Sequence, residues 1–171
     1  MSLAKQNFAI ASEEGLNNQI NMELTASYTY TSLAAYFDRD NVALPGLVKF
    51  FRESAIEERE HAQMLIDYVN QRGGRVTFQP IPAPNVEWQS AKHAIEATLQ
   101  LEKDVNKSLL NVHNISAEQG DPQLCDFLES HFLTEQVEAI KKISDMLTQL
   151  NLVGGDSLGL YLWDQNLLNK N

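Results

Sequence analysis

Several residue types are scarce in this sequence, and each shortage excludes a class of protein. Among 171 residues there is a single cysteine, Cys125, so no intrachain disulfide can form and a reducing compartment is expected. The 8 glycines and 5 prolines are too few for a collagen-like or low-complexity chain. No stretch approaches the roughly 18 apolar residues of a membrane-spanning helix, and residues 1–14 hold no apolar signal-peptide core. We therefore expect a cytoplasmic protein that does not contact membranes.

Lysine and arginine are scarce as well. There are 13 of them against 23 aspartates and glutamates, which gives a formal net charge of -10. Nucleic-acid binding needs clustered basic side chains that neutralise phosphates, so we expect no nucleic-acid partner. A protein this acidic attracts cations instead.

Glycine and proline gather at a few positions, and between them apolar residues recur every three or four positions, which is the helical period. The pattern predicts four long helices and a short apolar one, over about 12–39, 45–73, 90–119, 121–154 and 157–168. Ser12, Asp121 and Asp156 are expected N-caps, and Pro45 and Pro122 suit the first position of a helix.

Connection lengths predict the topology. The links after the first and third helices are so short that they can join only antiparallel neighbours. Pro80, Pro82 and Pro84 favour an extended backbone in the link between the second and third helices, which at about 3.1 Å per residue can run the length of a helix. We therefore predict an all-α, up-down-down-up bundle with one long crossover. It forms a single domain over 1–171, with an N-terminal arm (1–11), the bundle (12–154) and a short fifth helix with the tail (155–171).

Ionisable residues interrupt the apolar seams of three of these helices. On the second helix, Glu58 and His61 are three positions apart and share one face. The seam of the first helix carries Glu23 and Tyr30, and that of the third carries Glu102. Carboxylates that leave water together repel one another and lose solvation unless a positive charge lies between them.

A single Glu-x-x-His pair is usually a surface pair or a satisfied core pair. The three acids together are different, because their seams contain no lysine or arginine, which leaves protonation or a bound metal. The neutral imidazole of His61 among the acids favours a metal. Carboxylate oxygens with one histidine suit iron or manganese better than structural zinc, although zinc would bind too, and iron is the metal we expect.

Longer motifs resemble eukaryotic ferritins of the heavy-chain type over nearly the whole chain. The motifs are YFDRD (36–40), EEREH (57–61), QRGG (71–74), LEK followed by VN (101–106), LCDF (124–127) and EQ (135–136). The resemblance implies a ferritin-like four-helix bundle with a di-iron ferroxidase centre. One iron would be held by Glu23, Glu58 and His61, and Glu58 would bridge to a second iron on Glu102, with Gln136 and Tyr30 close by. Other divalent cations could replace iron.

The same resemblance implies the reaction and the assembly. Fe(II) would be oxidised by dioxygen or hydrogen peroxide and stored as a ferric oxyhydroxide mineral in a hollow shell of about 24 subunits, made of this chain alone or mixed with another ferritin chain. The fourth helix, however, has no histidine after Glu135 in EQVEA (135–139). Fewer ligands predict a more weakly held second iron, which suits a centre whose product leaves for a store.

Four residues resemble the entry channels of ferritin shells. Asp126 and Glu129, one helical turn apart, match the acids that line three-fold channels, and His113 and His131 are expected near that passage. Without the resemblance, acids at the start of a helix are usually partners of the helix dipole.

Further residues resemble the inner surface and the four-fold axis. Glu57 and Glu60 match the acids that nucleate mineral, while Gln63 stands where heavy chains often have another glutamate. The short last helix is too apolar to lie in water, so we expect it to pack between subunits, with Asn166 in the place of a histidine common in vertebrate chains.

Two other functions stay open at this point. A structural, light-type ferritin subunit would nucleate mineral without oxidising iron, but such chains lack the equivalents of Glu58 and His61. The other function is that of a di-iron oxidase or peroxidase, or of a DNA-protecting miniferritin. The fifth helix and the absence of a four-cysteine segment both disfavour it.

Overall fold

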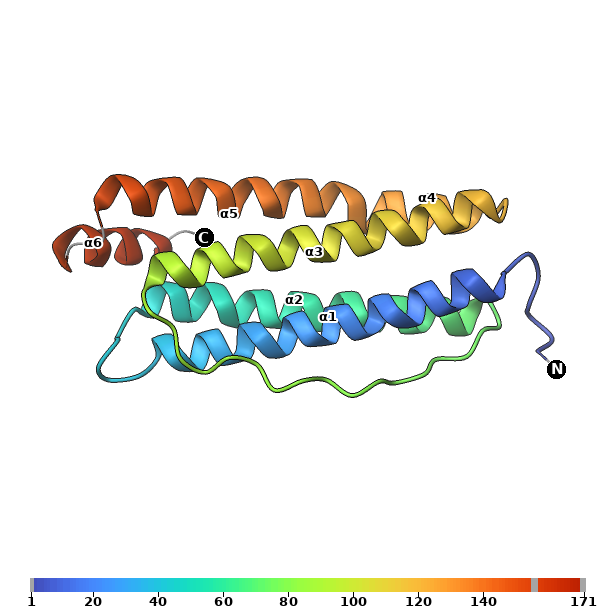
Figure 1. Cartoon of the computed structure of the whole chain (residues 1–171), viewed down its shortest axis with the longest axis horizontal. Coiled ribbons are helices and arrows are strands. Elements are labelled where there is room, and N and C mark those ends of the chain that lie inside the picture. The colour runs from blue at the N-terminus through green and yellow to red at the C-terminus, as the bar shows by residue number, and fades with distance from the viewer. Residues whose placement is uncertain (1, 155–156, 170–171) are drawn as a thin grey trace.

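All regular secondary structure is helical in residues 2–154 and 157–169, which are the residues that this computed structural model describes. The elements are α1 (Ile10–Phe37), α2 (Pro45–Gln71), α3 (Ala91–Glu118), α4 (Pro122–Leu128), the π-helical segment η1 (Glu129–Leu133), α5 (Thr134–Val153) and α6 (Ser157–Leu168). Figure 1 shows α1, α2, α3 and the α4–α5 segment lying lengthwise beside one another, with α6 at one end. This confirms the predicted all-α bundle with a short last helix. None of the described helices has the length and apolarity needed to cross a membrane.

The link between α2 and α3 runs along α1 from one end of the bundle to the other, as Figure 1 shows. Side chains of α1 hold it at two levels: Asn17 donates to the carbonyl oxygen of Arg75 at 2.9 Å, and Ser32 donates to that of Asn85 at 2.6 Å. The extended link lets α2 and α3 run in the same direction. The helices therefore follow the predicted up-down-down-up order.

Of the three expected N-caps, the structure bears out Asp121 and not Ser12. Asp121 accepts the backbone N–H of Leu124 at 3.1 Å, as expected of an N-cap. The expected cap Ser12 is wrong, because α1 begins two residues earlier and Ser12 is buried inside it. Phe8 anchors this end of α1, since its buried ring packs edge-on against Tyr68 at 6.5 Å between centroids. The expected cap Asp156 lies outside the described residues.

The fourth predicted helix is not one regular helix. Between α4 and α5 the backbone widens into η1, and Phe132 of this segment is buried with its ring 5.5 Å from that of His61. A π-helical turn adds a residue to the turn and so rotates everything that follows, and such turns are frequent at functional sites. The sequence carries no turn or proline signal here, so its helical period predicts an unbroken helix.

The start of α2 is held by α6. The buried carboxylate of Asp164 accepts the backbone N–H groups of Gly46 at 2.9 Å and Leu47 at 2.8 Å. The first residues of α2 have no side-chain cap of their own, so Asp164 satisfies amides that α2 leaves free. A Cβ atom on Gly46 would lie 2.1 Å from the carbonyl oxygen of Asp164, which explains why a glycine occupies this position.

Replacing Asp164 by Ala should lower the free energy of unfolding by about 2 kcal/mol, because two buried amides of α2 lose their acceptor. Urea denaturation at a fixed protein concentration measures the change. The matched control is Asp40→Ala, which removes an exposed carboxylate from the neighbouring loop and should have little effect. Equal stability of the two variants would contradict the role of Asp164.

Candidate metal centre

Donor atoms from α1 and α2 converge in the middle of the bundle. One ligand atom each from Glu23, Glu58 and His61 lies within 4.8 Å of the others. All three side chains are buried, and Glu23 is 0% exposed. The ring Nδ1 of His61 lies 3.2 Å from a carboxylate oxygen of Glu58, so the Glu-x-x-His spacing does place both groups on one face. Two carboxylates and one imidazole at this separation can share a single cation.

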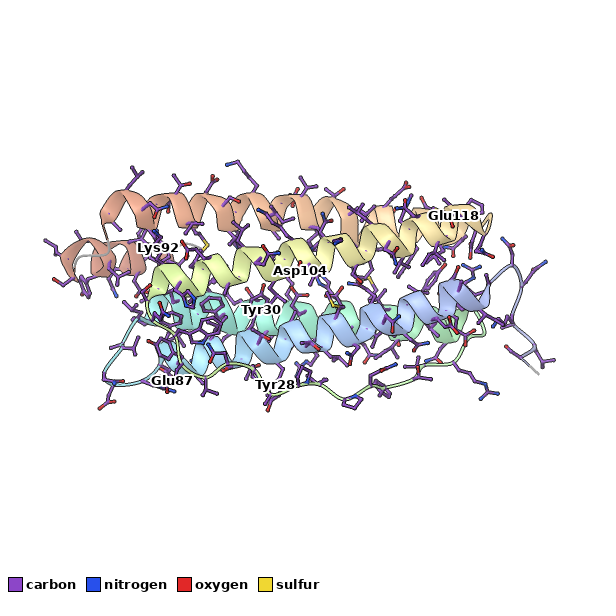
Figure 2. All side chains as sticks on the ribbon, viewed as in Figure 1. Tyr28, Tyr30, Glu87, Lys92, Asp104 and Glu118 are labelled. Atoms are coloured by element: carbon purple, nitrogen blue, oxygen red, sulfur yellow. The ribbon has the colours of Figure 1, made fainter. Side chains whose placement is uncertain are left out.

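Helices α1, α3 and α5 hold a third buried carboxylate beside this group. Glu102 of α3 accepts a hydrogen bond from the hydroxyl of Tyr30 on α1. The side-chain amide of Gln136 on α5 donates to the other carboxylate oxygen of Glu102 at 3.2 Å. Figure 2 shows Tyr30 on the side of α1 that faces α3, whereas Tyr28 lies on the side of the crossover. The structure therefore brings the expected residues of all four helices to one level of the bundle.

One oxygen at the centre has no partner, which is the observation that fits a cation. Glu23 accepts the side-chain N–H of Gln19 at 2.7 Å with Oε1. Its other oxygen, Oε2, is buried and has no hydrogen-bond partner among the described residues. A buried carboxylate oxygen without a partner is costly, and a metal ion among Glu23, Glu58 and His61 removes that cost.

Burial changes the protonation of these acids. Loss of solvation, followed by the charge of Glu58, raises the pKa of Glu23 well above its usual value. The pKa of Glu58 is raised to about 8, mainly by burial and also by the charges of Glu102 and Glu57, against a lowering interaction with Glu23. Burial and the charge of Glu102 also raise the pKa of Tyr30. A cation that binds here displaces protons from the carboxyl groups.

A small cavity joins the centre to the outside of the bundle. Its volume is about 40 Å³, and its lining includes Glu57, Glu58, His61, Glu102, Glu135, Gln136 and Lys142. Glu135 was not assigned a role from the sequence, yet its Oε2 lies 3.2 Å from Nε2 of His61. The EQ pair at 135–136 could have indicated this position. Neighbouring residues on a helix point about 100° apart, so with Gln136 facing the core Glu135 lies at the edge of it. Lys142 follows Glu135 by seven positions and so lies on the same face of α5.

The expected channel residues lie away from this centre. Asp126 on α4 and Glu129 at the start of η1 are exposed. A carboxylate oxygen of Glu129, Oε1, lies 2.6 Å from Nε2 of His113, so this contact joins η1 to α3. His131 is exposed, and its ring lies 5.1 Å from that of Phe127.

The expected inner-surface acids lie next to the cavity. Glu57 and Glu60 are exposed and line an adjoining open hollow of about 370 Å³ together with Glu53 and Lys142. Burial and the neighbouring Glu135 raise the pKa of Glu57. An acidic surface therefore begins where the centre opens.

Known proteins resemble this chain over nearly its whole length. A family model described as a ferritin-like domain matches residues 13–153. The chain is 55% identical to Ferritin-1, chloroplastic, of Brassica napus over 173 residues, which cover 98% of this chain and 68% of that protein. It is 52% identical to soma ferritin of Lymnaea stagnalis over 171 residues, with 99% and 98% covered. It is 49% identical to the middle subunit of ferritin from Salmo salar over 170 residues, with 98% and 97% covered.

The metal-free protein should become less stable as the pH rises through the pKa of Glu58. The folded pKa of about 8 exceeds the ordinary value of 4.5, so between these values the folded state binds more protons than the unfolded state. The free energy of unfolding therefore falls with rising pH in this window and levels off above it. Urea denaturation in a chelator at about pH 5.5, 7 and 8.5 measures the slope, which Glu58→Gln should reduce. Equal slopes in both proteins would contradict this assignment.

Proposed function

The chain belongs to the ferritin family of iron-storage proteins, and from that premise we propose that it oxidises the iron it stores. Fe(II) binds at the buried Glu23, Glu58 and His61 and at the adjacent Glu102, is oxidised there, and leaves as Fe(III) for a mineral inside a hollow shell. In this proposal iron is the substrate of the centre, and two ions occupy it at a time.

The unpartnered Oε2 of Glu23 carries this proposal. It lies in the same buried group as Glu58 and His61, where a cation among the three side chains would give it a partner. A purely structural subunit gains nothing from this arrangement, because buried acids without a counter-charge destabilise the fold. Light-type subunits lack the equivalents of Glu58 and His61, so the presence and burial of both residues here disfavours that alternative.

The residues of the centre define the reaction. In this proposal Glu58 bridges the two ions, which is supported by its position beside Glu23 and His61 and by the cavity that it lines with Glu102. Each Fe(II) gives up one electron, so a pair reduces dioxygen with two protons to hydrogen peroxide, or hydrogen peroxide with two protons to two waters. Gln136 contributes a neutral amide where a histidine would bind more strongly, so the second ion is held less tightly and can leave.

The assembly belongs to the same proposal. We infer one ferritin-like domain over 1–171 that forms a cytoplasmic shell of about 24 subunits, alone or mixed with another ferritin chain. The apolar side chains of Leu158, Tyr161 and Leu162 on α6 are 68%, 55% and 57% exposed in the single chain, which supports packing of α6 between subunits. Asn166 would then face the four-fold axis.

Aerobic addition of Fe(II) at well over two ions per chain tests the function. Ferric absorbance should rise in a fast phase that saturates near two ions per chain, and then grow slowly in material that sediments with a very large particle. Oxidation that ends with the fast phase would indicate a di-iron oxidase instead. Absence of catalysed oxidation would indicate a structural subunit.

Replacing Glu58 by Lys together with His61 by Gly should slow the fast phase by about 100-fold, because the bridging carboxylate and the imidazole ligand of the first ion are lost. Assembly should persist, since both side chains are buried within the chain. Stopped-flow absorbance and gel filtration measure the two properties. The control Asp104→Lys changes an exposed acid of α3, labelled in Figure 2, only two residues from Glu102. A normal rate in the double variant would contradict the site.

Replacing Asp126 and Glu129 by Ala should delay the arrival of Fe(II) without changing the centre, if these exposed acids line an entry channel. The initial rate should fall several-fold at limiting Fe(II) and recover at high Fe(II), because weaker attraction lowers the local cation concentration. Metal stoichiometry at the centre serves as the control. An unchanged initial rate would contradict the channel role and leave both acids as partners of the helix dipole.

A further inference from the structure

One buried amide on α1 contacts the centre without being among its expected ligands. Gln19 lies four residues before Glu23, and its side-chain N–H donates to Oε1 of Glu23 at 2.7 Å. Both side chains are 0% exposed. Leu16 and Ile20, which lie next to Gln19 on the same seam, are apolar and buried as well. Packing alone would therefore favour another apolar side chain at position 19.

Helix stability does not explain this amide. A glutamine four residues before an acid is a pair that stabilises exposed helices slightly. The chain has two exposed examples, Gln63 with Asp67 at 2.9 Å on α2 and Gln100 with Asp104 at 3.0 Å on α3. In the described part of the chain, however, the buried Oε1 of Gln19 has no hydrogen-bond partner. An unpartnered buried oxygen costs more than such a pair contributes, so the amide of Gln19 lowers the stability of the core.

The orientation of this amide decides which oxygen of Glu23 stays free. An ionised carboxylate only accepts hydrogen bonds, so the NH2 end of Gln19 has to face it. Gln19 thereby occupies Oε1 of Glu23, and Oε2 is the oxygen without a partner. One ligand atom each from Glu23, Glu58 and His61 lies within 4.8 Å of the others. An ion among these three side chains can therefore take Oε2 without breaking the hydrogen bond to Gln19.

We propose that Gln19 is a positioning residue that makes Glu23 bind the first iron through one oxygen, Oε2, instead of both. This proposal rests on the proposed ferroxidase function. A carboxylate that binds through both oxygens fills two coordination positions of an ion, whereas binding through one oxygen fills a single position. The position that Gln19 keeps open is available to the dioxygen or hydrogen peroxide that accepts the electrons of Fe(II). Hydrogen bonds to metal-binding carboxylates commonly orient them in this way.

Crystals of the assembled protein with bound Co(II) test the binding mode, because the contact of each Glu23 oxygen with the ion can be measured. In the unmodified protein Oε2 alone should contact the ion. In Gln19→Met, which has a similar length and no donor, Oε1 should turn to the ion, since a buried oxygen without a partner is costly. The matched control is Gln100→Met, which breaks an exposed glutamine–acid pair of α3 and should keep single-oxygen binding.

Two solution measurements supply further readouts. The visible absorption of Co(II) weakens as its coordination number rises, so with one Co(II) added per chain Gln19→Met should absorb less than the unmodified protein or Gln100→Met. The fast phase of Fe(II) oxidation should be about tenfold slower in Gln19→Met at saturating Fe(II), because the oxidant meets a filled position. Gel filtration shows whether each variant forms the same assembly.

The outcomes separate this proposal from the proposed function. Single-oxygen contact in both Gln19→Met and the unmodified protein would overturn the role of Gln19 alone, as would contact through both oxygens in the unmodified protein. Absence of Co(II) from Glu23, Glu58 and His61 in every protein would overturn the ferroxidase centre. Gln19→Leu repeats the test with another apolar side chain. If neither variant assembles, Gln19 is needed for folding and the proposal is wrong.

Discussion

Burial of three carboxylates at one level of a helical bundle is the constraint on which the rest of this structure depends. Glu23, Glu58 and Glu102 occupy positions where apolar side chains would stabilise the core more simply. Neighbouring polar groups satisfy one oxygen of Glu23 and both oxygens of Glu102: Gln19 and Tyr30 from α1 and Gln136 from α5 each donate a hydrogen bond. Among the described residues, the buried Oε2 of Glu23 has no hydrogen-bond partner. Stability is thus given up at the place where a cation restores it.

The architecture supplies these groups from elements that are far apart along the chain. The long crossover brings α3 to run alongside α1, so Glu102 reaches Tyr30 across 72 positions of sequence. The widened turn of η1 precedes Gln136 by a few residues and sets the rotation of α5 about its axis. At the far end, Asp164 of α6 fixes the start of α2, the helix that carries Glu58 and His61. Elements that carry none of the proposed metal ligands therefore still determine where those residues lie.

Much of this was predictable from sequence because helical periodicity is a local property. Glu58 and His61 share a face whatever surrounds them, and Glu23 and Glu102 interrupt seams whose other members are apolar. The start of α1 was mispredicted because packing of Phe8 on Tyr68 outweighed the capping signal of Ser12. The position of η1 depends on packing between helices, which no local pattern records. Contacts between side chains of different helices, such as Glu135 with His61, depend on that packing as well.

A centre that processes a stored metal has to bind an ion and also release it. The donor sets differ in strength: Glu23, Glu58 and His61 offer two carboxylates and an imidazole, whereas Glu102 and the neutral amide of Gln136 offer one carboxylate. Toward the surface, Glu57 and Glu135 line the cavity together with Lys142; burial raises the pKa of Glu57, and the charge of Lys142 acts against this by lowering it. Because Lys142 lines the same cavity as these acids, the mouth is not purely acidic, and it attracts a cation less strongly than the carboxylates alone would.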